Sequence, residues 1–166
     1  MSFALLASFP ALMAFAAASD LLTMTIPNRV SALLCAGFAL SCFALGLPLE
    51  TIGHHLSAGL FVLAVTFGLF AAGWIGGGDA KLAAATALWV GWGALAEYAL
   101  YASLLGGALT LLILYVRRWP LPGPLLRQPW IERLHRPETG VPYGIALAAA
   151  GLLIFPDTRI WLAGVV

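Results

Sequence analysis

The sequence predicts an all-α membrane protein of about six transmembrane helices. Its 166 residues are 62% hydrophobic and 9% charged, with a mean hydropathy of +0.98. A soluble domain normally carries about 25% charged residues, so most of this surface must face the lipid bilayer. Short polar segments divide the chain into long apolar runs, as expected of a single polytopic domain over 1–166. The net charge of +1 provides no basic field for nucleic acid.

Each expected helix is an apolar run of about the 20 residues needed to cross the hydrocarbon core. The first has no basic region ahead of it and exceeds signal-peptide length, so it is expected to be a retained span. The fourth could instead close early, at Gly91, Trp92 and Gly93, and the short sixth could extend into 157–166. Five or seven spans are therefore alternatives to six. The expected runs are 3–24, 29–47, 55–75, 80–96, 98–116 and 141–156.

The positive charges predict the orientation of these spans. With six crossings, only Arg159 falls on the side opposite to the other basic residues. The positive-inside rule then makes the basic side cytoplasmic and the N-terminus external. The basic residues on that side are Arg29, Lys81, Arg117, Arg118, Arg127, Arg133 and Arg136.

The longest polar stretch, 117–140, is rich in proline and arginine. This composition predicts an irregular cytoplasmic loop that lies close to the membrane surface. Two roles are open for it: a plain tether between two spans, or a wall or lid beside a functional site.

Two aspartates are expected to reach similar depth on the cytoplasmic side. Asp20 lies near the end of the first span and Asp79 at the junction of the third and fourth, whereas Glu97 falls at the opposite end. A carboxylate inside a membrane helix is a functional candidate by default. Two close carboxylates share one proton, so one can take a proton from water while the other polarises a peptide carbonyl. Alternatively, the two sit apart as solvated or capping residues.

Glycines crowd the chain ahead of Asp79, at Gly73, Gly76, Gly77 and Gly78. Glycine allows positive φ and a close approach by another backbone. An unwound segment here could accept an extended substrate beside the carboxylate. The alternative is close helix packing of the small-residue type.

The segment "GGGDAKL", 76–82, matches the GxGD signature of intramembrane aspartyl proteases and closely resembles the type IV prepilin peptidase family. The segments "SDLLTMTIPNRVS", 19–31, and "GVPYGIALAAAG", 140–151, resemble that family's first and last motifs. The resemblance implies that Asp20 and Asp79 are the catalytic pair and that no metal or organic cofactor takes part.

The resemblance also implies a substrate, a branch of the family and a location. The substrate is a prepilin with a short basic leader and a hydrophobic helix, cut at the cytoplasmic face of the bacterial inner membrane. Few residues precede Asp20 and no CxxC occurs, which resembles the peptidase-only branch of Flp/Tad pilus systems. N-methylation of the product is accordingly not expected. Archaeal preflagellin peptidases share the signature and are an alternative.

Several residues are expected to support the aspartates. Asn28 either caps the second helix or holds the Asp20 segment in place. Lys81 either extends to the lipid headgroups or contacts the substrate or an aspartate. Pro142 and Gly144 are expected to kink the last helix, and Tyr143 could offer its hydroxyl to the aspartates or the substrate.

Other polar and sulfur groups are given structural roles. His54 and His55 are expected in an external connection, and with no further Cys or His partners they predict no metal site. Cys35 and Cys42 lie in one apolar run and are expected to act as small hydrophobic residues. Glu97 is expected to form hydrogen bonds at the outer interface.

Two other function classes are compatible with paired intramembrane carboxylates. In a small transporter, Asp20 and Asp79 would relay protons or bind a cation, although the halves show no internal symmetry of the kind common in transporters. In an inert scaffold for pilus assembly, the aspartates would have no chemical role. The oligomeric state is left open by the sequence.

Overall fold

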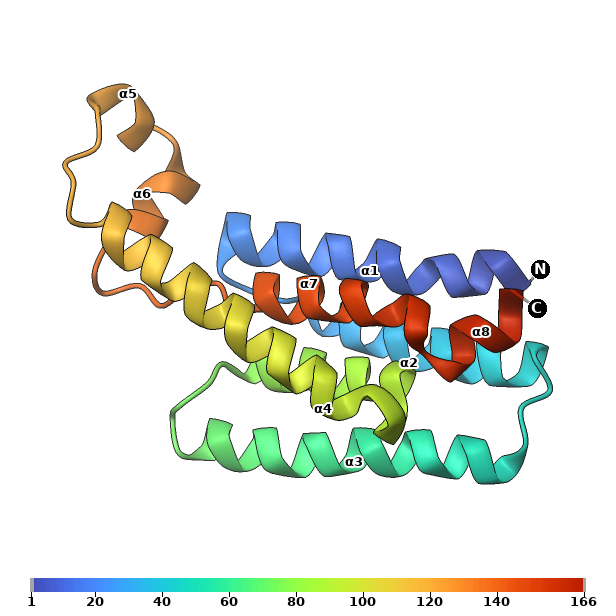
Figure 1. Ribbon diagram of the computed structural model, residues 1–166. Helices are drawn as coiled ribbons and strands as arrows, with labels where there is room; N and C mark the ends of the chain where they lie inside the picture. The colour runs from blue at the N-terminus through green and yellow to red at the C-terminus, as the bar shows by residue number, and fades with distance from the viewer. Residues whose placement is uncertain (1, 166) are drawn as a thin grey trace.

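The computed structural model describes residues 2–165, which form helices and connecting turns without a strand in that range (Figure 1). The predicted all-α class is therefore confirmed. The elements are α1 (Ser2–Thr23), α2 (Asn28–Ala44), α3 (Leu49–Ala71), α4 (Gly77–Val116), α5 (Gly123–Leu126), α6 (Pro129–His135), α7 (Gly144–Ile154), the 3-10 turn η1 (Phe155–Asp157) and α8 (Arg159–Val165).

The 40 residues of α4 form two helical arms, 77–90 and 92–116, separated by a break at Gly91. A straight helix of this length would measure about 60 Å, twice the hydrocarbon core of about 30 Å. Gly91 has φ 66° and ψ 176°, which is not helical. After it the second arm runs back toward the end of the molecule where the first arm began (Figure 1). Tyr98 on the second arm accordingly comes close enough to Asp79 for an electrostatic interaction.

This break corrects the expected boundary between the spans 80–96 and 98–116, which placed the turn near Glu97, and confirms the alternative of an early close at Gly91. His55 explains why the chain turns at Gly91 instead. Its Nδ1–H donates to the Leu88 carbonyl at 2.7 Å, one of the acceptors that a helix leaves unpaired at its end. A Cβ on Gly91 would lie 2.7 Å from the His55 ring. His54 and His55 thus lie within α3, which spans Leu49–Ala71 and not the expected 55–75, so neither is part of an external connection, and His55 is buried.

The remaining apolar helices lie close to their expected positions. Helices α1 and α2 match the runs 3–24 and 29–47 to within three residues at each end. The expected span 141–156 corresponds to α7 and η1. The loop 117–140 is less irregular than expected because Pro129 occupies the first turn of the short helix α6, where its missing N–H leaves no bond unmade.

Trp89 on the first arm is the centre of the core and is fully buried. Its indole N–H donates to the Leu34 carbonyl of α2 at 2.9 Å, and its ring packs against Phe9 and Phe155 with centroids 5.2 and 5.9 Å away. Large apolar side chains such as Phe43, 89% exposed, cover the outside. A surface of this kind is stable only in lipid, and α1, α3 and α4 include apolar stretches long enough to cross a membrane: Leu5–Thr23, Leu49–Ala71 and Gly77–Val116.

We expect Gly91→Ala to destabilise the protein, because its backbone conformation is almost exclusive to glycine and its new methyl group would collide with His55. The expected loss is about 1–3 kcal/mol of unfolding free energy, measured by denaturant titration in detergent micelles. Gly93→Ala is the matched control, since a Cβ there meets open space. Equal stability of the two variants would contradict this account of the break.

Candidate active site

The two aspartates lie at one end of the helical bundle. Asp20 is in the last turn of α1 and Asp79 in the first turn of α4. These two helix ends lie toward the end of the molecule that carries α5 and α6 (Figure 1). The carboxylates are close enough to act on each other electrostatically. The structure therefore brings together the pair that the sequence placed at similar depth.

Asp20 is 5% exposed and is held by the start of α7. The backbone N–H of Gly144 donates to Asp20 Oδ2 at 2.8 Å. Because Gly144 is the first residue of α7, this N–H is one of the donors that have no partner within the helix. A Cβ on Gly144 would lie 2.8 Å from the same oxygen and 2.6 Å from Ile26. Only glycine allows the carboxylate to come this close.

A tight turn after Asp20 brings Ile26 back onto the site. Met24 adopts a left-handed conformation with φ 55°, and its N–H donates to the Asp20 carbonyl at 2.8 Å. The Ser19 hydroxyl donates to the Thr25 carbonyl at 2.9 Å and closes the turn. Ile26 consequently packs against both Gly144 and Gly78, which places one apolar side chain between the segments that carry the aspartates.

Asp79 is half-buried and folds back on the start of its own helix. With Gly76 as the N-cap, Asp79 is the third helical residue, and its carboxylate interacts with the Gly76 backbone N–H. This is the side-chain-to-cap half of a capping box. A Cβ on Gly76 would lie 3.0 Å from Asp79 Oδ2. The glycine leaves room for the carboxylate to reach back.

The glycines ahead of Asp79 differ from the expected unwound segment. Gly77 and Gly78 are helical, and Gly73, with φ 77°, has the positive φ in this group. A Cβ on Gly77 would lie 3.2 Å from the Phe70 ring, and one on Gly78 would lie 3.3 Å from Ile26. These two glycines therefore permit close packing, which was the alternative interpretation. The irregular backbone is confined to 72–76.

Lys81 and Asn28 join the starts of α4 and α2. The Lys81 ammonium donates to Asn28 Oδ1 at 3.0 Å, and both residues are exposed. The expectation that Asn28 caps α2 is wrong, because Pro27 occupies the cap position and Asn28 is already the first helical residue. Its side chain instead connects the segment after Asp20 with the segment after Asp79.

Pro142 and Tyr143 lead the chain into α7. Pro142 is buried and precedes the helix, so it does not kink it as expected. The Tyr143 hydroxyl donates to the Ala102 carbonyl at 3.1 Å, and its ring fills the space that a Cβ on Gly106 would need. The hydroxyl is thus bonded to the second arm of α4 in this structure. Tyr143 positions the start of α7, and Gly144 with it.

Two arginines fasten the loop 117–140 beside the site. Arg117 donates to the carbonyls of Leu134 at 2.8 Å, Thr139 at 3.0 Å and Gly140 at 3.1 Å. Arg133 donates to the Leu22 carbonyl at 2.7 Å, two residues after Asp20. These bonds have no local signal in the sequence beyond the positive charges, which indicate only the orientation of the spans.

The groups gathered here can perform acid–base chemistry. Two carboxylates lie here, each next to a backbone N–H at the start of a helix. Asp20 is buried and Asp79 is half-buried. Among residues 2–165, no group of three or more His, Cys, Asp and Glu side chains lies close enough to hold a metal ion. What the site's own side chains supply is a pair of proton donors and acceptors.

The fold and the site define an all-helical membrane protein in which two aspartates from separate helices meet at one end of the bundle. The model of the type IV leader peptidase family matches residues 7–111, and the chain belongs to this family. Membership makes it a leader-peptidase-like protease of the membrane. No curated protein and no solved structure matches the chain significantly. The matched range includes both aspartates and ends before Gly144.

Gly144→Ala should disturb the Asp20 side of the site, because the methyl group would overlap both the carboxylate and Ile26. We expect a loss of about 1–3 kcal/mol in stability, typical of overpacking, seen as a lower melting temperature in detergent. Gly140→Ala is the control, since a Cβ there is unobstructed. If Gly144→Ala melts with Gly140→Ala and the parent protein, the contact between α7 and Asp20 is not as described.

Proposed function

We propose that this protein is an aspartic endopeptidase that removes the short basic leader from type IV or Flp-like prepilins. The observation that carries the proposal is the meeting of Asp20 and Asp79 at one end of a membrane bundle, in a chain of the type IV leader peptidase family. Asp20 and Asp79 are the catalytic residues in this proposal. Gly76, Gly77, Gly78, Lys81, Asn28, Pro142 and Tyr143 shape the site.

The chemistry needs one proton shared between the two carboxylates. The ionised carboxylate takes a proton from water, whose oxygen attacks the scissile carbonyl carbon, while the protonated carboxyl gives its proton to the carbonyl oxygen. The resulting diol gives one hydroxyl proton to the ionised carboxylate as the peptide C–N bond breaks, and the leaving nitrogen takes the proton held by the other carboxyl. Water is added across the bond, and the pair again holds one proton.

The surroundings of the aspartates favour a single negative charge at this depth. Asp20 faces the start of α7 and Asp79 lies in the first turn of α4. A helix start carries partial positive charge and free N–H donors, which stabilise a nearby anion. The two helix starts therefore lower the free-energy cost of holding one negative charge on this pair of carboxylates beside hydrocarbon.

The proposed site faces the cytoplasm in the bacterial inner membrane, and the distribution of positive charge supports this orientation. The end of α1 and the start of α4, which carry the aspartates, lie at one end of the bundle (Figure 1). The arginine-rich segment with α5 and α6 extends from this same end. The positive-inside rule puts this end in the cytoplasm and the N-terminus outside. A prepilin leader, itself basic, would be available for cleavage on that side.

Asp20→Asn and Asp79→Asn should each abolish leader cleavage while the protein still inserts and folds. Asparagine preserves the shape and can still accept a backbone hydrogen bond, but it cannot exchange a proton, so we expect a rate loss of at least about 10²–10⁴. Cleavage is measured by mass spectrometry of candidate prepilins incubated with the purified protein. Glu97→Gln is the control, because Glu97 lines the pocket at the opposite end. Cleavage retained in both aspartate variants would overturn the proposal.

The orientation can be tested with single cysteines in a Cys35→Ala, Cys42→Ala background. Glu138→Cys lies in the arginine-rich loop and Glu50→Cys at the start of α3, and both positions are exposed. In spheroplasts, a membrane-impermeant maleimide should label Glu50→Cys directly and Glu138→Cys only after lysis. The reverse pattern would place the site outside the cell.

A further inference from the structure

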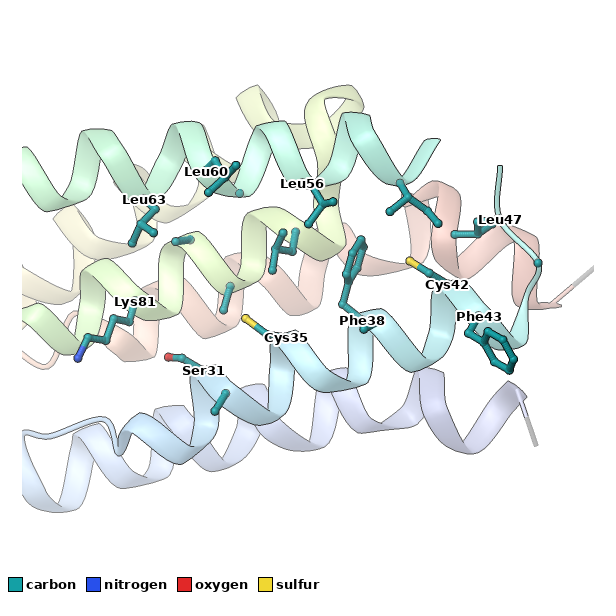
Figure 2. A pocket seen from close by; sticks show the side chains of 18 residues that line it. Ser31, Cys35, Phe38, Cys42, Phe43, Leu47, Leu56, Leu60, Leu63 and Lys81 are labelled. Atoms are coloured by element: carbon teal, nitrogen blue, oxygen red, sulfur yellow. The ribbon is translucent and has the colours of Figure 1, made fainter. Parts of the chain in front are cut away.

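A long apolar groove lies between α2 and α3, with the first arm of α4 as its floor (Figure 2). Its volume is about 1040 Å³. At one end lie Ser31 and Lys81, and at the other lie Phe43 and Leu47 (Figure 2). Lys81 is two residues beyond Asp79, so the groove begins beside the candidate active site.

The groove runs through the membrane rather than along one leaflet. From Ser31 to Phe43, α2 alone rises about 18 Å along it, and the lining continues to Leu47. One leaflet of the hydrocarbon core is about 15 Å thick. The occupant must therefore extend past the bilayer midplane, as an apolar peptide helix does.

The shape of the lining suits a helix backbone. Three small exposed residues of α2, Ala32, Cys35 and Ala39, line one wall of the groove, and the exposed side chains of Leu56, Leu60 and Leu63 line the other. Helices associate in membranes where small residues let their backbones approach closely. A helix laid here would continue the packing that α2 and α3 already make with α4.

The charge at the groove's end determines which part of a substrate can enter. Lys81 is bonded to the neutral oxygen of Asn28, so this bond leaves its positive charge uncompensated. A basic leader is repelled from this end, whereas an apolar helix is not. Such a substrate would place its helix in the groove and its leader beyond Asp79, with the junction at the aspartates.

We propose that this groove holds the hydrophobic helix of the substrate during leader cleavage. The inference rests on the proposed function, because it takes the substrate to be a basic leader joined to an apolar helix. The groove then determines which proteins are cleaved, since only a chain with such a helix presents its leader junction to Asp20 and Asp79.

Kinetics of Ala39→Trp test the proposal. Ala39 is exposed and lines the groove, so tryptophan there fills space that the substrate helix needs. We expect KM for the intact substrate to rise at least about tenfold with kcat retained. Ala36→Trp is the matched control, because Ala36 is also exposed on α2 but lies outside the groove lining. If the parent protein cleaves the substrate and the two variants have the same KM, the groove is not the docking site.

Photocrosslinking provides a second measurement that separates the possible occupants. p-Benzoylphenylalanine replaces Leu60, which lines the groove, or Leu111, which is exposed on the second arm, in the Asp79→Asn protein. We expect the substrate to crosslink at position 60 and not at 111. Adducts at position 60 with lipid or a second copy of this chain alone would overturn the docking proposal. Absence of cleavage by the parent protein would instead refute the proposed function itself.

Discussion

The hydrogen bond from the Gly144 N–H to Asp20 is the contact on which the arrangement of the site depends. It joins residues 124 positions apart and brings the start of α7 onto the end of α1. Its physical basis is the cost of a carboxylate beside hydrocarbon, which falls when free N–H groups at a helix start face it. Asp79 meets the same need by folding back on Gly76. Each aspartate is thus held by a backbone N–H at the start of a helix, Asp20 by α7 and Asp79 by α4. The end of α1 therefore lies beside the starts of α4 and α7.

The position of α7 depends in turn on the break in α4. His55 binds the free Leu88 carbonyl and occupies the space beside Gly91, and the second arm can then return to the site end. The returning arm presents the Ala102 carbonyl and the gap at Gly106 to Tyr143, the residue before Gly144. A buried histidine at the opposite end of the bundle therefore supports the hydrogen bond to Asp20. These contacts connect His55 to Asp20 through the packing of the second arm of α4 against Tyr143.

Much of this fold could be predicted from hydropathy, because a bilayer imposes helix length and position with few exceptions. The ends of α1 and α2 and the shared end of Asp20 and Asp79 followed from run lengths and charge. The break at Gly91 was expected only as an alternative, because apolar residues continue beyond it, and the tertiary contact with His55 is what selects this position. The role of Gly78 depends likewise on Ile26, which is distant in sequence, and that of Gly77 depends on how the turn 72–76 folds Phe70 back onto it. Local signals cannot resolve such choices, since the same glycines allow both unwinding and close packing.

The two aspartates differ in exposure, and under the proposed function this difference favours one side for the arrival of the substrate. Asp20 is buried against the Gly144 amide. Arg133 of the loop 117–140 binds the Leu22 carbonyl beside it, so the loop covers the Asp20 side of the site. Asp79 is half-buried beside the irregular segment 72–76 and two residues from the groove end at Lys81. A chain entering sideways from the bilayer along the proposed docking groove would meet Asp79 first and reach Asp20 through it. Such an approach keeps the apolar helix in lipid or protein throughout, and only the leader junction has to leave helical structure. In this approach the substrate backbone unwinds at the leader junction, and the enzyme backbone does not need to unwind. Gly77 and Gly78 are helical, which is consistent with this.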